Sequence, residues 1–286
     1  MLFRSKIQEV ATEISQAITR YDDEDAQIKK QIQQNAPGFT KDMAYGRRYF
    51  VDLLASNVMT RVQAESFSGT KGDGFPLAAM VTMLAVEQKS FILIMEAHVF
   101  TVCPTAIPTL PQPRKDATED EIMTGLGMQR DKKTGDFESF PQFLARTENI
   151  VSFMAAVQSS LPSSHPLFGG NAGAVKWLKH FLDLLPAAPE APLPLITAPV
   201  LGAFLTSAGH MLANVHEKYF RPMLEKIQSD VVERLDEGEL GKPSATRLNK
   251  LLEGGFDGFK KNLPAKAIKE LYYGASDQSK KNEAVT

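Results

Sequence analysis

The sequence predicts an all-α protein. Apolar residues recur at steps of three and four over most of the chain, beginning with Ile7, Val10 and Ile14, and this spacing is typical of amphipathic helices. No run of β-branched residues with a period of two appears, and no Asn-Gly turn signal marks a hairpin. We therefore expect about ten helices and no sheet.

Composition limits the classes of protein to consider. The 286 residues are 43% hydrophobic and 23% charged, as in globular proteins. The formal charge of 32 − 34 = −2 gives no general attraction for nucleic acid or anionic membrane, so an anion site requires a local cluster. The single cysteine, Cys103, excludes an intrachain disulfide, and the N-terminus lacks the apolar stretch of a secretory signal. We expect a nuclear or cytosolic protein without membrane insertion or direct nucleic-acid binding.

One apolar stretch, residues 75–104, is predicted to organise the fold. It contains two apolar segments, 77–86 and 91–102, separated by the polar turn 87–90. Neither segment has a clean polar face, and each is shorter than the roughly 20 residues that cross a bilayer. We expect a central helical hairpin wrapped by the other helices, ending where Pro104 restricts the residue before it.

The other helices are predicted from the same spacing. They cover residues 3–34 (one helix, or two joined near 21–25), 40–67, 118–126, 140–161, 174–185, 200–237, 244–252, 256–262 and 264–273. Pro222 is expected to kink or divide the helix over 200–237. Six apolar residues of the second helix are expected to face inward: Tyr49, Phe50, Leu53, Leu54, Val58 and Val62. We expect irregular antiparallel helix pairs, HEAT-like or MIF4G-like, in a single domain over residues 1–274 with a disordered tail at 275–286.

Candidate metal and catalytic groups have simpler explanations. The acidic run at 22–25 would need a second acidic cluster to hold magnesium as in helical isoprenoid synthases, and a solvated helix junction explains it. His98 and Cys103 are too few ligands for zinc, while His210 and His216 suit surface or capping positions. No nucleophile elbow, phosphate-binding loop or dinucleotide-binding loop is present. We predict no catalytic residue, no metal and no required cofactor.

Basic residues concentrate in the first two predicted helices, as a candidate polyphosphate site. They are Lys29, Lys30, Lys41, Arg47, Arg48 and Arg61. Lysine and arginine on adjacent helices form strong charge-assisted bonds with phosphate groups. The alternative explanation is an ordinary solvated face.

Aromatic residues in the second half of the chain are candidates for a partner-binding groove. They are Trp177, Phe181, Phe204 and Phe220. Interface hot spots favour aromatic side chains seated in desolvated pockets. The alternative is that these side chains belong to the core.

A series of short motifs, taken in order, resembles the C-terminal domain of the GLE family (Gle-one). The motifs are FPLA (75–78), Cys103-Pro104 with Pro108, Gly125 and Gly127, FLAR (143–146), His165-Pro166, VKWL (175–178), and Phe220 before Pro222. The resemblance spans roughly residues 40 to 273. It implies an all-helical MIF4G-like or HEAT-like domain that has no active site.

The resemblance also implies partners and a location. Members of this family mediate mRNA export at the nuclear pore complex, on its cytoplasmic face. They bind and stimulate a DEAD-box RNA-dependent ATPase during mRNP remodelling, and an FG-nucleoporin C-terminal segment docks on them. In some fungal members lysines hold inositol hexakisphosphate between the two proteins. Those lysines precede the Cys-Pro pair, where this chain has Phe100, Thr101 and Val102. We therefore expect weak ligand binding, or binding that requires the ATPase.

Two other functions remain open from the sequence. A MIF4G-like scaffold of translation initiation would engage a DEAD-box partner through the same architecture. A helical isoprenoid-type synthase would instead turn over a diphosphate with magnesium. A turnover assay separates the enzyme from the scaffolds, and a pull-down of the DEAD-box partner separates the two scaffolds.

Overall fold

The structure is a computed structural model that describes residues 9–20, 45–64, 74–109, 116–163, 165–188, 190–235 and 241–262, with residues 23, 27 and 238. Throughout these ranges the fold is all-α, as predicted, and the only strand-like feature is an isolated bridge between Arg130 and Phe137. A helical segment covers residues 9–20. The named helices are α2 (Tyr45–Ala64), α3 (Gly74–Glu87), α4 (Lys89–Val102), α5 (Glu119–Leu126), α6 (Phe140–Ser160), α7 (Gly170–Leu184), α8 (Thr197–Val215), α9 (Glu217–Lys226), α10 (Lys242–Leu252) and α11 (Gly255–Lys261).

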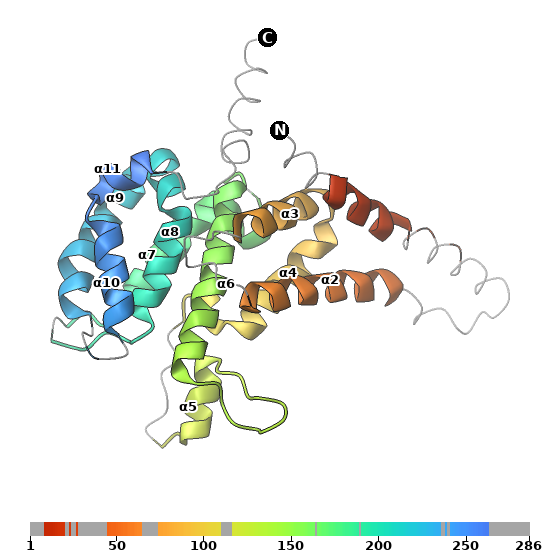
Figure 1. The fold of residues 1–286 in the computed structure, drawn as a ribbon. Coiled ribbons are helices and arrows are strands. Elements are labelled where there is room, and N and C mark those ends of the chain that lie inside the picture. Colours follow the sequence, from red (N-terminus) through yellow and green to blue (C-terminus); the bar gives the residue numbers. More distant parts are fainter. Residues whose placement is uncertain are drawn as a thin grey trace, which may run out of the picture.

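Helix α6 occupies the centre of the molecule. It runs between the group formed by α2, α3 and α4 and the group formed by α7 to α11 (Figure 1). Every residue from 146 to 159 is buried, and α8 and α3 pack along its two sides. The contact with α8 is close because small residues meet there, including Ser152 and Ser207, whose hydroxyls lie 2.7 Å apart. α6 therefore joins the two groups of helices into one packed core.

The predicted apolar hairpin exists, but it is not the centre. α3 and α4 are separated at Gln88 and α4 ends before Cys103, as expected. However, α3 packs chiefly on α6 and α4 packs chiefly on α2. Val86 and Leu93 are 62% and 74% exposed. The central position of α6 was missed because its buried residues include many polar ones, which weaken the apolar signal.

Helix α2 contradicts part of the prediction about inward-facing residues. Val58 and Val62 are buried, whereas Tyr49 and Leu53 are 67% and 46% exposed. Phe50 and Leu54 are partly buried. Apolar residues lie on both sides of this helix, so spacing alone does not show which side faces the core.

The short helix α5 forms for the local reasons that its sequence suggests. Thr118 and Glu121 make a reciprocal capping box at its start, with the Thr118 side chain accepting from the Glu121 amide. Three acidic residues in the first turn complement the helix dipole. Gly127 ends the helix at a φ of 82°, a conformation that glycine adopts without strain. The predicted helix over residues 118–126 is therefore confirmed.

The long helix expected over 200–237 divides at His216 rather than at Pro222. His216 is both the last cap of α8 and the first cap of α9, and Pro222 lies inside α9. A proline removes one backbone donor within its own helix, but it does not fix the point at which the preceding helix stops. A π-helical turn, Ile227–Val231, follows α9. The predicted helix over 264–273, the tail at 275–286 and most of the acidic run at 22–25 lie outside the described residues.

Replacement by alanine is expected to have opposite effects on stability at two glycines of α8. A Cβ atom at Gly202 would meet no other atom, so Gly202→Ala should stabilise the protein by about 0.5–1 kcal/mol through helix propensity. A Cβ atom at Gly209 would overlap the ring of Phe259 in α11, so Gly209→Ala should destabilise by about 1–3 kcal/mol. Urea unfolding of both variants measures the difference. Changes of the same sign would contradict the packing of α11 on α8.

Candidate functional site: an arginine-centred junction and its pocket

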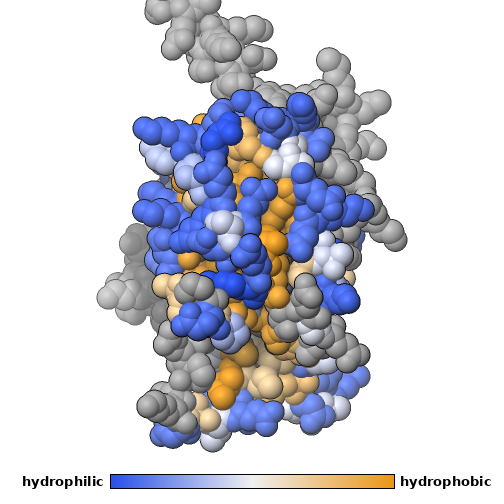
Figure 2. Space-filling view, turned by 90° about the vertical axis from the view of Figure 1, so that its left-hand side faces the viewer, coloured by the Kyte–Doolittle hydropathy of each residue, from blue (hydrophilic) through white to orange (hydrophobic). Residues whose placement is uncertain are grey.

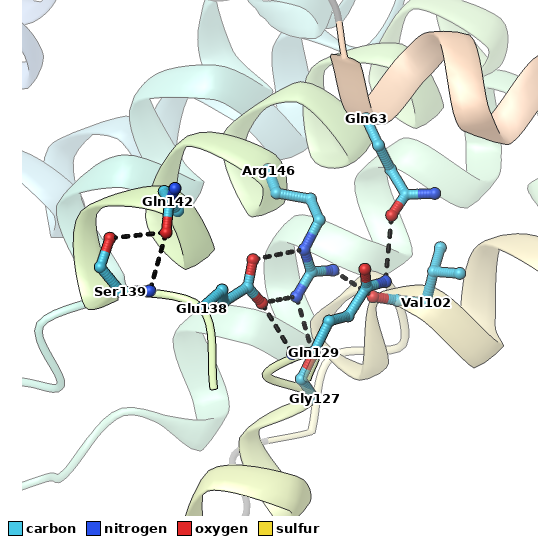
Figure 3. Close-up of polar contacts among 8 residues, drawn as sticks. All are labelled: Gln63, Val102, Gly127, Gln129, Glu138, Ser139, Gln142 and Arg146. Atoms are coloured by element: carbon cyan, nitrogen blue, oxygen red, sulfur yellow. Dashed lines mark hydrogen bonds and ion pairs between the residues drawn. The ribbon is translucent and has the colours of Figure 1, made fainter. Parts of the chain in front are cut away.

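Arg146 links three segments that are distant in sequence. Its guanidinium donates through Nη1 to the carbonyl oxygen of Val102 at 2.6 Å and through Nη2 to that of Gly127 at 2.8 Å. It also forms an ion pair with Glu138, which accepts from Nε at 3.1 Å (Figure 3). The side chains of Arg146 and Glu138 are only 8% and 15% exposed. Because the last carbonyls of a helix lack intrahelical donors, this cation satisfies the ends of both α4 and α5.

An ordered turn extends from this junction. It covers residues 128–138, where the backbone amide of Asp131 donates to the carbonyl of Asp136 at 2.8 Å. The Asp131 carboxylate accepts the amides of two following residues, and these bonds lower its pKa. Gly135 adopts a φ of 79°, and the Arg130 guanidinium lies over the Phe137 ring at 3.8 Å. The turn is therefore held by its own contacts.

A pocket of about 620 Å³ opens between this turn, α2 and α6. Side-chain amides span it, since Gln129 Nε2 donates to Gln63 Oε1 at 3.0 Å (Figure 3). Its lining consists of Gln63, Ala64, Gln129, Arg130, Asp131, Thr134, Asp136, Phe137, Glu138, Gln142, Ala145, Arg146 and Asn149. This set contains no histidine, cysteine, serine or lysine, and its one hydroxyl, that of Thr134, accepts the amide of Asp136 at 3.2 Å. The amide, carboxylate and guanidinium groups of this lining suit a polar ligand.

The candidate metal and thiol groups among the remaining described residues lie apart or are buried. Among them no group of three His, Cys, Asp or Glu side chains could hold a metal ion. Cys103 is buried, and this burial raises the pKa of its thiol to about 11, so the reactive thiolate is scarce at neutral pH. His98 pairs with Asp52 at 2.8 Å, and His210 is buried rather than at the surface. No helix in the described ranges is long and apolar enough to cross a bilayer.

The predicted basic cluster is only partly described. Arg61 lies in the last turn of α2 and is exposed, while Arg47 and Arg48 belong to the first turns of the same helix. Lys29, Lys30 and Lys41 lie outside the described residues. The polyphosphate site therefore stays a prediction.

The four predicted partner-binding aromatics are all buried. Trp177 is 5% exposed, and the rings of Phe181, Phe204 and Phe220 are fully enclosed. Trp177 stacks on Phe204 at 4.3 Å and on Phe181 at 5.2 Å between ring centroids. Phe220 lies apart from this stack, against Phe256 of α11. A partner would have to displace the covering helices to reach these rings, so in this arrangement they serve the core.

Arg146 was missed as a functional residue by the sequence analysis. It forms part of the FLAR motif, yet no role was assigned to it. The available signal was an arginine placed among inward-facing positions of α6, since a buried arginine requires several acceptors. The identity of those acceptors depends on tertiary structure.

Glu96 of α4 supports a strained turn and makes a test of pH dependence possible. Its carboxylate accepts the amide of Phe168 at 2.7 Å, and Phe168 has a φ of 49°. Burial raises the pKa of Glu96, and the hydrogen bond opposes that rise. The pKa of Glu96 in the folded protein lies above the ordinary value of 4.5. The protonated carboxyl therefore contributes fully to the free energy of unfolding below pH 4.5, and this contribution is lost as the pH rises through the folded pKa.

Replacement of Glu96 by glutamine should therefore stabilise the protein at pH 7. Glutamine keeps an acceptor for the Phe168 amide and has no charge to desolvate. The advantage over wild type should shrink toward pH 4.5, and thermal melting at the two pH values measures it. Glu96→Ala, the matched control, should lose about 1–3 kcal/mol by leaving the amide unpaired. A glutamine variant as unstable as the alanine variant would contradict this account.

The described residues thus form an all-helical fold with a polar pocket between α2, α6 and the turn over residues 128–138. Comparison with known proteins gives the family. The chain belongs to the GLE1-like protein family, whose model matches residues 3–228. The resemblance seen in the sequence motifs is confirmed.

Two solved structures share the fold. One is a chain of an S. cerevisiae complex described as a Dbp5 C-terminal-domain variant bound to Gle1 and IP6, with 18% identity and a TM-score of 0.62; the match covers 90% of this chain and 87% of that chain. The other is a chain of the corresponding complex with a Gle1 point variant, with 17% identity, a TM-score of 0.62, and coverage of 91% and 87%. A search of curated proteins gave no match.

Proposed function

We propose that this chain is a non-enzymatic mRNA export factor that binds and stimulates a DEAD-box RNA-dependent ATPase. The family match over residues 3–228 is the observation that carries the proposal. The two similar solved structures contain a Dbp5 domain together with Gle1 and IP6, which supports the same kind of partner.

The packing supports a mechanism based on rigidity. α6 connects the two groups of helices through a continuous buried surface, so the domain can act as a stiff support. Held against both RecA-like lobes, such a support favours the separated arrangement that releases RNA or nucleotide. The support can shift the equilibrium between the separated and the closed arrangement of the lobes only by the difference between its binding free energies for these two states.

A steady-state ATPase assay tests this function. The purified chain is added to an RNA-stimulated DEAD-box ATPase of the Dbp5 type, with RNA at subsaturating concentration. We expect the ATP hydrolysis rate to rise with the concentration of the chain, while the chain alone hydrolyses no ATP. Binding without stimulation would contradict the regulatory mechanism, and absence of binding would contradict the whole proposal.

Inositol hexakisphosphate is the proposed ligand of the basic residues in the first two helices. The free domain lacks lysines at residues 100–102, so the ligand should bind it weakly and bind the complex with the ATPase more strongly. Melting curves with and without the ligand, at low and moderate salt, measure this difference because charged contacts weaken as salt increases. A large, salt-sensitive rise in the melting temperature of the free domain on adding the ligand would contradict the expected dependence of binding on the ATPase. If the ligand changes the melting temperature of neither the free domain nor the complex, it is removed from the proposal.

We further propose docking of an FG-nucleoporin segment and a location on the cytoplasmic face of the nuclear pore. The face shown in Figure 2 carries an apolar stripe bordered by polar residues, on the side of the C-terminal helices. Such a stripe is more accessible than the enclosed stack of Trp177, Phe181 and Phe204. Titration with an FG-containing peptide, followed by calorimetry, tests this docking. Saturable binding is expected, and a linear response would exclude it.

A further inference from the structure

The turn over residues 128–138 presents its central residues to solvent between two anchored ends. It projects from the helices beside α5 (Figure 1). Met128 is buried at one end, and Glu138 pairs with Arg146 at the other, whereas every residue over 131–136 is exposed. Segments with few buried contacts open locally at low cost in free energy, even where their own hydrogen bonds order them. An enzyme can therefore reach the centre of this turn without unfolding the rest of the domain.

Thr134 lies in the exposed part of the turn. Its hydroxyl oxygen accepts the amide of Asp136 at 3.2 Å, and its own amide donates to Asp131 Oδ1 at 3.0 Å. A threonine hydroxyl has two lone pairs and one proton, so one accepted bond leaves it a second lone pair and its O–H. The hydroxyl can therefore serve as the attacking group of a transfer reaction once the turn opens.

Basic residues precede Thr134 in the sequence. Arg130 lies four positions before it, and Lys132 and Lys133 lie two and one positions before it. Both lysines are exposed. Asp131 interrupts the run, but one of its carboxylate oxygens accepts the amides of Lys133 and Thr134. Protein kinases select substrates by such charge patterns, so this order suits a kinase whose substrate groove is acidic.

We propose that Thr134 is a phosphorylation site for a serine/threonine protein kinase of this basophilic class. The Thr134 oxygen forms a bond to the γ-phosphorus of ATP, the bond from that phosphorus to the β–γ bridging oxygen breaks, and ADP leaves. The hydroxyl proton passes to the catalytic aspartate of the kinase. The product is a phosphothreonine with a charge of about −2. This site goes beyond the function proposed above and does not depend on it.

The phosphate changes the charge of the neighbouring pocket. Two basic and three acidic residues line that pocket, which gives 2 − 3 = −1, and the phosphate brings this to about −3. Arg130 lies close to the modified residue, since its Nη1 donates to the Gly135 carbonyl at 2.8 Å while its Nη2 pairs with Asp120 of α5. A phosphate offers this guanidinium more charge and more acceptor oxygens than a carboxylate does. We expect Arg130 to leave Asp120, which loosens the first turn of α5.

The experiment treats the full chain with ATP and the catalytic subunit of a basophilic kinase, and mass spectrometry locates the phosphate. We expect phosphate at Thr134. Thr134→Val should take up about tenfold less phosphate, Thr134→Ser should keep the modification, and the double variant Lys132→Ala/Lys133→Ala should be modified about tenfold more slowly. Thr124 is the internal control, because it is exposed in α5 but follows acidic residues, and it should stay unmodified.

Amide hydrogen exchange tests the consequence for α5. Residues 119–123 should exchange at least about threefold faster in the phosphorylated chain than in the unmodified one. Phosphate found elsewhere, or taken up equally by the double lysine variant, would overturn the assignment of Thr134. Modification of the urea-denatured chain but not of the folded chain would show that the turn does not open to a kinase. Unchanged exchange in a fully phosphorylated chain would overturn the transfer of Arg130 from Asp120 to the phosphate.

Discussion

Replacement of Arg146 by alanine should destabilise the protein by about 3–5 kcal/mol, the range measured when one partner of a buried ion pair is removed. The substitution leaves the Glu138 carboxylate 15% exposed without its cation. It also removes the donors to the carbonyl oxygens of Val102 and Gly127. Urea unfolding at neutral pH measures the loss, which should appear as a lower midpoint.

Two controls separate the buried pair from charge loss in general. Arg130→Ala removes an exposed pair with Asp120, whose side chains are 44% and 71% exposed, together with a bond to the Gly135 carbonyl and the contact with the Phe137 ring, so its effect should stay within about 2 kcal/mol. Arg146→Met with Glu138→Leu removes both charges and should recover much of the loss, although the two carbonyls stay unpaired. Equal losses for Arg146→Ala and Arg130→Ala would show that the junction contributes no more than a surface pair.

Replacement of Phe204 by alanine should destabilise by about 3–5 kcal/mol, as for other buried aromatic side chains. Phe204 is fully buried and stacks on Trp177, whose Nε1 donates to the carbonyl of Ala106 at 2.8 Å. The cavity should therefore loosen α7 and shift Trp177 emission to longer wavelength. Urea unfolding followed by tryptophan fluorescence reports both effects.

Tyr219→Ala is the matched control for this variant, because Tyr219 is 57% exposed and its loss should change stability by about 0.5 kcal/mol or less. A Phe204→Ala protein that keeps wild-type stability yet loses affinity for an apolar peptide would favour the groove predicted from the sequence. That result would require the C-terminal helices to open in solution.

The sequence predicted those features that depend on local chemistry. The helix over residues 118–126, the polar break at Gln88 and the stop before Pro104 each depend on neighbouring backbone groups. Such signals lie within a few residues of the structure that they specify. The helix content and most boundaries could therefore be predicted.

Features that depend on distant partners could not be predicted. The Arg146 acceptors at Val102 and Gly127 lie 44 and 19 residues away, so no local pattern names them. The exposed side of α2 carries the same residue types as its buried side, and only the position of α4 and α6 decides which is which. The candidate aromatics are enclosed for a similar reason, since Trp177 of α7 stacks on Phe204 of α8 and Phe220 lies against Phe256 of α11.

The burial of α8 sets an order of events for the nascent chain. α8 contains no Asp, Glu, Lys or Arg, and it packs on α6, α10 and α11. Its His210 donates to the carbonyl of Phe259, which is made 49 residues later. At about 5–20 residues per second, the ribosome takes roughly 2–10 seconds to supply that cover. During this interval the apolar sides of α8 are uncovered, so production of the protein should depend on chaperones that hold emerging chains.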